Sequence, residues 1–110
     1  MRRGPGGASW DMPRPLTTGE IERSLAGLPG WVERERALEK TFCFASFQAA
    51  MGFMARAAVE AEAMDHHPEW TNTYRRVRVR LSTHDVGGRV TALDVELARR
   101  FERVVGKGAE

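Results

Sequence analysis

Residues 38–61 read LEKTFCFASFQAAMGFMARAAVEA, and the spacing of their apolar side chains changes at Ser46. Before Ser46 the side chains alternate with a period of two, which predicts a strand over 38–44 with one buried face. One face carries Leu38, Lys40, Phe42 and Phe44, and the other carries Glu39, Thr41 and Cys43. Ser46 suits a helix N-cap, and a spacing of three and four residues follows it, so we expect a long helix over 46–64. Its apolar stripe, expected to be a core face and wide enough for a partner helix, consists of Phe47, Ala50, Met51, Met54, Ala58 and Ala61.

The residues before this stretch predict one helix and one strand. Thr17-Thr18-Gly19-Glu20 matches a capping box, in which a threonine is followed three residues later by a glutamate. The helix that it begins covers about 18–27 and stops at Pro29-Gly30. We expect a strand over 31–35 to pair with the strand 38–44 in a hairpin that turns at Arg36-Ala37.

The residues after it predict two strands. Pro68 disfavours the helical conformation at His67 and so ends the long helix. A short extended piece over 70–74 precedes a strand over 76–83 that alternates strictly, which is typical of a strand with one wet face. Its inward side chains are Val77, Val79 and Leu81, and its outward ones are Arg76, Arg78, Arg80 and Ser82.

A last helix completes the pattern. Gly87-Gly88 forms a turn, Thr91 and Asp94 resemble a capping pair, and a helix follows over about 92–105. The order is therefore helix-strand-strand-helix-strand-strand-helix. Hairpins of this kind predict an α+β fold, a four-stranded antiparallel sheet with helices packed on one face.

The composition is that of a small globular protein. The chain has 110 residues, a net charge of +2 and both signs of charge intermixed, which argues against a nucleic-acid stripe. We expect residues 1–15, rich in Gly, Pro and Arg, to be a disordered lead-in, and 16–106 to form one domain. Cys43 is alone, so neither a disulfide nor a cysteine metal cluster is expected, and a buried thiol fits a reducing compartment. We find no apolar run that could span a bilayer and no signal peptide, and expect a cytoplasmic protein without membrane contact.

Residues 62–70, EAMDHHPEW, hold two of the three histidines. His66 and His67 are adjacent and precede Pro68, and His84 lies at the end of the next regular segment. Histidine has an unperturbed pKa of about 6.5, which suits proton transfer near neutral pH. A scaffold usually presents such groups on its connections. These positions are therefore the candidate proton-transfer groups.

Several readings of these residues stay open. The adjacent histidines could be a surface accident, and a zinc site would be the next rival, although the spacing lacks the usual ligand signature. Asp94 could simply cap the last helix, could act at a functional site, or could do both. Glu62, four residues before His66, could hydrogen-bond an imidazole or be a solvated helix acid.

Taken together, these positions resemble the pattern of the pterin-4a-carbinolamine dehydratase family. That pattern is an acidic residue, three residues, His-His-Pro, an aromatic residue after a short gap, nine residues to a His, and then an Asp. This chain matches with Glu62, His66-His67-Pro68, Tyr74, His84 and Asp94. The similarity extends over about 16–105 and includes STHD at 82–85 and FCFASF before the long helix. The interval from His84 to Asp94 is one residue longer than is usual in the family.

The resemblance implies a reaction and a set of roles. The family removes water from 4a-hydroxytetrahydropterin, left by aromatic amino-acid hydroxylases, and gives a quinonoid dihydropterin. By resemblance His66 and His84 are the acid/base pair, and His67 binds and orients the pterin. Glu62, Pro68, Trp70 and Asp94 are the further substrate-site residues, and neither a metal nor a cofactor is implied.

The resemblance also implies partners and rivals. Family members assemble as dimers or tetramers, so a homodimer or homotetramer is expected, with a possible link to an aromatic amino-acid hydroxylase. One rival function is a non-enzymatic interaction module of the same fold, either a transcription cofactor or a Rubisco assembly helper. Another is a dehydratase that serves a different pterin. The sequence leaves open the physiological pterin, the partner hydroxylase, the choice between dimer and tetramer, and whether Asp94 is more than a helix cap.

Overall fold

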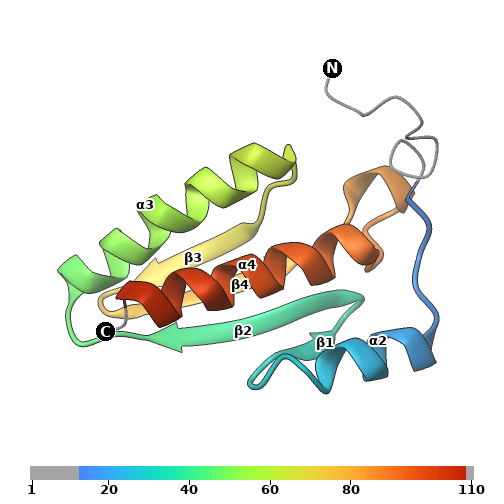
Figure 1. Cartoon of the computed structure of the whole chain (residues 1–110), viewed down its shortest axis with the longest axis horizontal. Helices are drawn as coiled ribbons and strands as arrows, with labels where there is room; N and C mark the ends of the chain where they lie inside the picture. Colours follow the sequence, from blue (N-terminus) through green and yellow to red (C-terminus); the bar gives the residue numbers. More distant parts are fainter. Residues whose placement is uncertain (1–12, 109–110) are drawn as a thin grey trace.

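The chain folds into a sheet covered by helices on one face. The computed structural model describes residues 13–108. The elements, in order, are α2 (Thr18–Leu25), β1 (Val32–Arg34), β2 (Ala37–Cys43), α3 (Phe47–Met64), β3 (Glu69–Thr73), β4 (Arg76–Leu81), the 3-10 turn η1 (His84–Val86) and α4 (Ala92–Gly108). Figure 1 shows α3 and α4 lying across the same face of the sheet, with α2 beside β1. The predicted α+β class and element order are confirmed.

The sheet has the strand order β1-β2-β4-β3, and every neighbouring pair is antiparallel. β2 and β4 are the central strands. Their register pairs Leu38 with Leu81 and Phe42 with Val77, so the inward side chains of the two strands stand opposite each other. The predicted alternation of β2 and β4 is therefore confirmed, and it directs these side chains into the core under the helices.

The core face of α3 differs from the predicted stripe. The buried side chains of α3 are Ala50, Phe53, Ala57 and Ala61. Phe47 is 49% exposed and Val59 is 66% exposed, so an apolar outer face remains next to solvent. The prediction of Phe47 and Ala58 as core residues was wrong, because a helix that is apolar nearly all round has no single face that its spacing can identify.

The opposite face of the sheet is open and charged. Glu39 of β2 accepts hydrogen bonds from Arg78 at 3.2 Å and from Arg80 at 2.8 Å. The hydrogen bond from Arg78, more than that from Arg80, keeps the pKa of Glu39 below its usual value. Cys43 lies on this face and is exposed, so the predicted buried thiol was wrong. The alternation had placed Cys43 opposite the core, and none of the helices within residues 13–108 covers that side.

The first hairpin turns one residue earlier than predicted. Glu35 and Arg36 both have positive φ, at 52° and 68°, and Arg34 pairs with Ala37 across the turn. Two successive residues with positive φ are typical of a two-residue hairpin turn whose twist matches the strands. Glycine or asparagine usually marks such a turn, and neither is present here, which is why the sequence did not locate it.

The amino-terminal segment is fastened to α2. Thr17 and Glu20 form both bonds of the predicted capping box, and Arg14 donates two hydrogen bonds to the Glu20 carboxylate, at 2.9 and 2.8 Å. Residues 1–12 of the predicted lead-in 1–15 lie outside the described residues. The proposed domain bounds stay a prediction. None of the helices in the described part of the chain is long and apolar enough to cross a membrane.

Candidate active site

The last turn of α3 fixes the backbone at His66. Asp65 adopts the left-handed conformation, with φ 52° and ψ 43°. Its N–H donates to the carbonyl of Glu62 at 3.1 Å, and the N–H of His66 donates to the carbonyl of Ala61 at 3.0 Å. This pair of bonds is the Schellman ending of a helix, and Pro68 shortly after it prevents continuation. The helix end therefore determines where the His66 ring leaves the chain.

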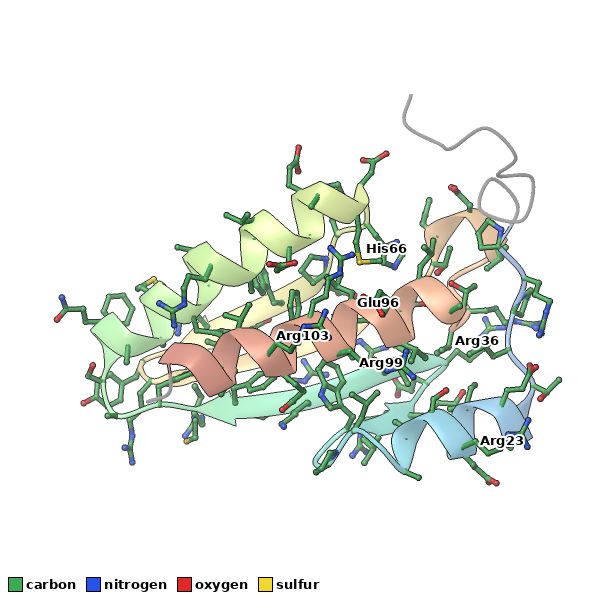
Figure 2. All side chains as sticks on the ribbon, in the orientation of Figure 1. Arg23, Arg36, His66, Glu96, Arg99 and Arg103 are labelled. Carbon is green, nitrogen blue, oxygen red and sulfur yellow. The ribbon has the colours of Figure 1, made fainter. Side chains whose placement is uncertain are left out.

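His66 forms a buried pair with Asp94, which lies in the first turn of α4. The Nε2 atom of His66 is 2.6 Å from Oδ1 of Asp94, across 28 positions of sequence. His66 is 9% exposed and Asp94 is 0% exposed. Figure 2 shows His66 between the end of α3 and α4. Because a carboxylate oxygen accepts hydrogen bonds, this contact assigns the donor role to Nε2, and Nδ1 makes none of the hydrogen bonds found among residues 13–108.

Asp94 is held by three donors. Its Oδ2 accepts from the Thr83 hydroxyl at 2.8 Å and from the backbone N–H of Thr91 at 2.9 Å, while Oδ1 faces His66. The bond from Thr91 is the one by which an acid in the first turn caps a helix. The helix-cap reading of Asp94 is therefore confirmed, and the same carboxylate also pairs with a histidine, while its role at a functional site stays a prediction. The three donors compensate for the loss of water around it.

Two threonine hydroxyls belong to this network and were not predicted. The Oγ1 atoms of Thr83 and Thr91 lie 2.7 Å apart, and both residues are buried. Thr83 has the same parity as the inward-facing Val77, Val79 and Leu81, so it continues the inward side of β4 beyond the end of the strand. A polar residue at the next inward position was the signal in the sequence that could have identified it.

His67 and Glu62 form a second, exposed pair. The Nε2 atom of His67 lies 3.0 Å from Oε1 of Glu62, with side chains 57% and 81% exposed. Glu62 therefore does hydrogen-bond an imidazole, as one of the two readings allowed, and the imidazole is that of His67. The adjacent rings of His66 and His67 contact different carboxylates, because the chain has already left the helix at this point.

The other residues named by the family pattern take no part in these two pairs. His84 is exposed, begins η1 and directly follows Thr83, which brings its backbone next to the Asp94 network. Its side chain makes none of the hydrogen bonds or ion pairs found among residues 13–108. Pro68 is half-buried, and Trp70 stacks on Phe101 with centroids 6.1 Å apart. Tyr74 lies in the turn after β3, five residues of extended chain beyond Pro68, so this element of the family pattern is not at the histidines.

The surroundings of the pairs include a cleft. It has a volume of about 840 Å³ and lies between the end of α3, the start of α4 and residues 13–16, with Met64, Leu93 and Glu96 among its lining. Its lining includes Met64 and Leu93, which are close in sequence to His66 and Asp94, but neither Asp94 nor any of the three histidines lines it. Over the described range 13–108, no three His, Cys, Asp or Glu side chains are grouped so that they could hold a metal ion. The absence of a metal stays a prediction.

The fold and these pairs define a class: a small α+β domain with a buried aspartate–histidine pair at the end of its longest helix. Comparison with known proteins supplies the family. The family model for pterin 4 alpha carbinolamine dehydratase matches residues 14–104. The chain therefore belongs to the pterin-4-alpha-carbinolamine dehydratase family.

Individual relatives agree with this assignment. A protein of Opitutus terrae, provisionally named a pterin-4-alpha-carbinolamine dehydratase, is 61% identical over 93 residues, covering 84% of this chain and 96% of the relative. A protein of Bradyrhizobium diazoefficiens with the same provisional name is 54% identical over 95 residues, covering 84% and 94%. The crystal structure of a transcriptional coactivator/pterin dehydratase from Brucella melitensis aligns with a TM-score of 0.79 at 43% identity, covering 83% of this chain and 98% of that one.

Proposed function

We propose that this protein dehydrates 4a-hydroxytetrahydropterin (pterin-4a-carbinolamine) to quinonoid dihydropterin and water. The observation that carries the proposal is the buried His66–Asp94 pair, with its 2.6 Å contact, in a chain that the family model matches over residues 14–104. The pair gives two residues of the family pattern, His66 and Asp94, a physical role. It leaves one nitrogen of an oriented imidazole for proton transfer at the end of a rigid helix.

The reaction needs two proton transfers and no change of oxidation state. The C4a–O bond breaks as a proton reaches the leaving hydroxyl, which departs as water. A ring nitrogen loses its proton, and its electron pair forms the new C=N bond. One proton is added and one is removed, so groups that exchange protons near neutral pH suffice. We propose that neither a metal nor a redox cofactor takes part.

His66 and His84 divide these two transfers. His66 acts through Nδ1, because Nε2 is engaged with Asp94 at 2.6 Å. Asp94 holds the ring in one tautomer and stabilises the imidazolium that forms when Nδ1 takes up a proton, as an aspartate does in other aspartate–histidine pairs. His84 is exposed on η1 and can turn toward the substrate from the neighbouring connection.

Substrate binding falls to the exposed side of the site. His67 is oriented by Glu62 at 3.0 Å and remains 57% exposed, so its ring can contact the pterin. Pro68 keeps the connection rigid after the helix. Trp70 of β3 stacks on Phe101 of α4 and so holds the strand that directly follows the histidines and Pro68. Together these residues hold the pterin while His66 and His84 act on it.

The reaction belongs to tetrahydropterin recycling in the cytoplasm, where an aromatic amino-acid hydroxylase would supply the substrate.

The outer face of α3, which we define by the exposed Phe47 and Val59 and the half-exposed Met51, is the surface through which copies of the chain pair. A symmetric dimer or tetramer would cover it.

One observation favours a second function. The crystal structure from Brucella melitensis carries the description of a coactivator as well as a dehydratase. In that case the outer face of α3 would contact another protein, and the histidines would be dispensable. A chain that lacks dehydratase activity but binds a protein partner through Phe47 and Val59 would favour this alternative.

The test is a stopped-flow assay of carbinolamine loss, with the spontaneous rate subtracted. The wild-type protein should accelerate the reaction, and His84→Ala should lower kcat. Glu69→Ala is the control, because Glu69 is exposed at the start of β3, outside both imidazole–carboxylate pairs, and its side chain makes a 4.0 Å contact with Arg80. Absence of acceleration by the folded wild-type protein would refute the proposal.

A further inference from the structure

We propose that Thr83 is a positioning residue: acting through Asp94, its hydroxyl fixes the tautomer and orientation of His66. Among residues 13–108, Thr83 makes no direct hydrogen bond to His66. Its Oγ1 donates to Oδ2 of Asp94 at 2.8 Å, and Oδ1 of the same carboxylate meets Nε2 of His66 at 2.6 Å. The consequence for catalysis rests on the proposed dehydratase function, whereas the consequence for the His66 tautomer does not.

The count of protons gives the network one direction. A threonine hydroxyl has one proton, and that of Thr83 goes to Asp94, so the 2.7 Å contact between Thr83 and Thr91 requires Thr91 to donate. The Oγ1 atom of Thr91 in turn accepts from the N–H of Leu93 at 3.2 Å. The chain of donors therefore starts at a backbone amide of the first turn of α4 and ends at the carboxylate. Hydrogen bonds that all point the same way polarise one another.

The backbone of Thr83 is fixed independently of this network. Its N–H donates to the carbonyl of Arg89 at 2.8 Å, and its carbonyl accepts from Val86 at 3.2 Å and from Gly88 at 3.1 Å. Gly87 and Gly88 have φ of 76° and 73°, a conformation that glycine adopts without strain. These bonds hold Thr83 in place whatever its side chain, so a change of the side chain tests the hydroxyl alone.

The hydroxyl matters because of how the carboxylate is oriented. With Thr83 and Thr91 both donating to Oδ2, the carboxylate plane is set, and Oδ1 faces Nε2 of His66. Without the hydroxyl, Oδ2 keeps one donor, and the carboxylate can turn to share Oδ2 with the imidazole. The bond from Nε2–H to the turned carboxylate is then longer or less linear, so the preference for the Nε2-protonated tautomer weakens and Nδ1 is no longer presented in one state.

The first experiment reads the tautomer directly and needs no substrate. The protein is labelled with ¹⁵N at histidine, and the ring nitrogens of His66 are recorded for wild type, Thr83→Val and Thr83→Ser. Val keeps the branched shape and lacks the hydroxyl, whereas Ser keeps the hydroxyl. We expect wild type and Thr83→Ser to show a single Nε2-protonated ring, and Thr83→Val to show a mixture of tautomers. An unchanged His66 spectrum in folded Thr83→Val would overturn the proposal.

The second experiment follows the dehydratase reaction in the same proteins. Thr83→Val should lower kcat about 10-fold, as loss of a group behind a functional histidine commonly does, with KM nearly unchanged and recovery in Thr83→Ser. Val77→Ala is the control for stability alone, because Val77 is buried in β4 away from the network. An equal loss of kcat in Val77→Ala at matched stability would contradict a positioning role.

Thr91→Val keeps the experiment decisive if Thr83→Val does not fold. It removes the hydroxyl that donates to Thr83 while the Thr91 N–H still binds Asp94. The proposal predicts the same mixture of tautomers to a smaller extent, and an unchanged spectrum contradicts it. If the tautomer shifts as expected but no variant, including wild type, accelerates dehydration, the positioning role stands and the proposed function fails.

Discussion

Residues 13–108 contain two imidazole–carboxylate pairs side by side, and the pairs differ mainly in burial. The His66–Asp94 contact is 2.6 Å long, with side chains 10% and 0% exposed. The His67–Glu62 contact is 3.0 Å long, with side chains 57% and 81% exposed. The first pair joins two helices across 28 positions of sequence, whereas the second lies within one helix end. The same chemical groups thus form one fixed unit and one adaptable unit.

Burial explains the difference in what the two pairs can do. A buried carboxylate must keep its donors, because water cannot replace them, and three donors hold Asp94. An exposed pair competes with water and contributes little to stability, usually between about 0 and 1 kcal/mol. The proposed proton-transfer residue His66 has the buried environment, and the proposed ligand-contacting residue His67 has the exposed one. Each prediction below tests this division.

The largest expected difference is between Asp94→Asn and Glu62→Gln. The amide group of asparagine has one N–H end and one oxygen end. In one orientation the N–H end faces the donors of Thr83 and Thr91, and in the other it faces Nε2 of His66, so the network that fixes the His66 tautomer is disrupted in both. We expect kcat to fall about 100- to 10,000-fold in Asp94→Asn, the usual range for loss of acid–base catalysis. Glu62→Gln should leave kcat within about 5-fold of wild type, because the exposed pair is worth at most about 1 kcal/mol. Equal effects in steady-state kinetics would contradict the division between the two pairs.

A contrast of the same kind exists on the two faces of α3. Phe53 is fully buried against Phe42 and Phe44, so Phe53→Ala should lower the free energy of unfolding by about 3–5 kcal/mol. Phe47→Ala should leave unfolding of the subunit nearly unchanged and weaken assembly instead, because Phe47 is 49% exposed. Urea denaturation and light scattering distinguish the two results. A wild-type monomer at micromolar concentration would remove the basis for the second expectation.

His67→Ala should affect binding more than catalysis. Within the described chain the ring forms a hydrogen bond with Glu62 alone, and it is exposed. Its removal should therefore raise KM about 10-fold, equivalent to about 1.4 kcal/mol, with kcat little changed. Glu69→Ala serves as the control, because Glu69 is exposed at the start of β3, two positions after His67. A fall in kcat with KM unchanged would place His67 with His66 rather than with the binding groups.

The smallest expected effect comes from the exposed pair of Arg14 and Glu20. The hydrogen bond from Arg14 is the main reason that the pKa of Glu20 is lowered to about 2 from its usual 4.5. A carboxyl with a lowered pKa stabilises the folded state above pH 4.5, and this contribution is lost as the pH falls through about 2. Wild type should therefore exceed Glu20→Gln in stability at neutral pH and converge with it near pH 2. Urea midpoints that differ equally at both pH values would contradict this.

The sequence predicted the fold well where the period of the side chains was clear. In β2 and β4 the alternation identified the inward side chains correctly, and the capping pattern at Thr17 located the start of α2. It failed on α3, where the excess of small apolar residues concealed the core face. It also failed at the turn at Glu35 and Arg36, where the strain of positive φ leaves no mark in the residue types.

The site was predicted only in part, because spacing identifies residues but not their partners. The spacing named His66 and Asp94 without showing that they touch, since the contact depends on how α3 and α4 pack. It assigned Glu62 to no particular imidazole, and the left-handed residue Asp65 decides that Glu62 meets His67. Thr83 was overlooked because a threonine is unremarkable until its strand parity shows that it faces inward.

The most direct test of the account is the dehydration rate of the folded double variant His66→Ala/His84→Ala. Carbinolamine loss is followed for wild type and variant at equal concentration, the spontaneous rate is subtracted, and circular dichroism checks that the variant is folded. The account predicts acceleration by wild type and a rate close to the uncatalysed one for the double variant. A folded double variant that accelerates the reaction as well as wild type does would contradict the assignment of proton transfer to these histidines.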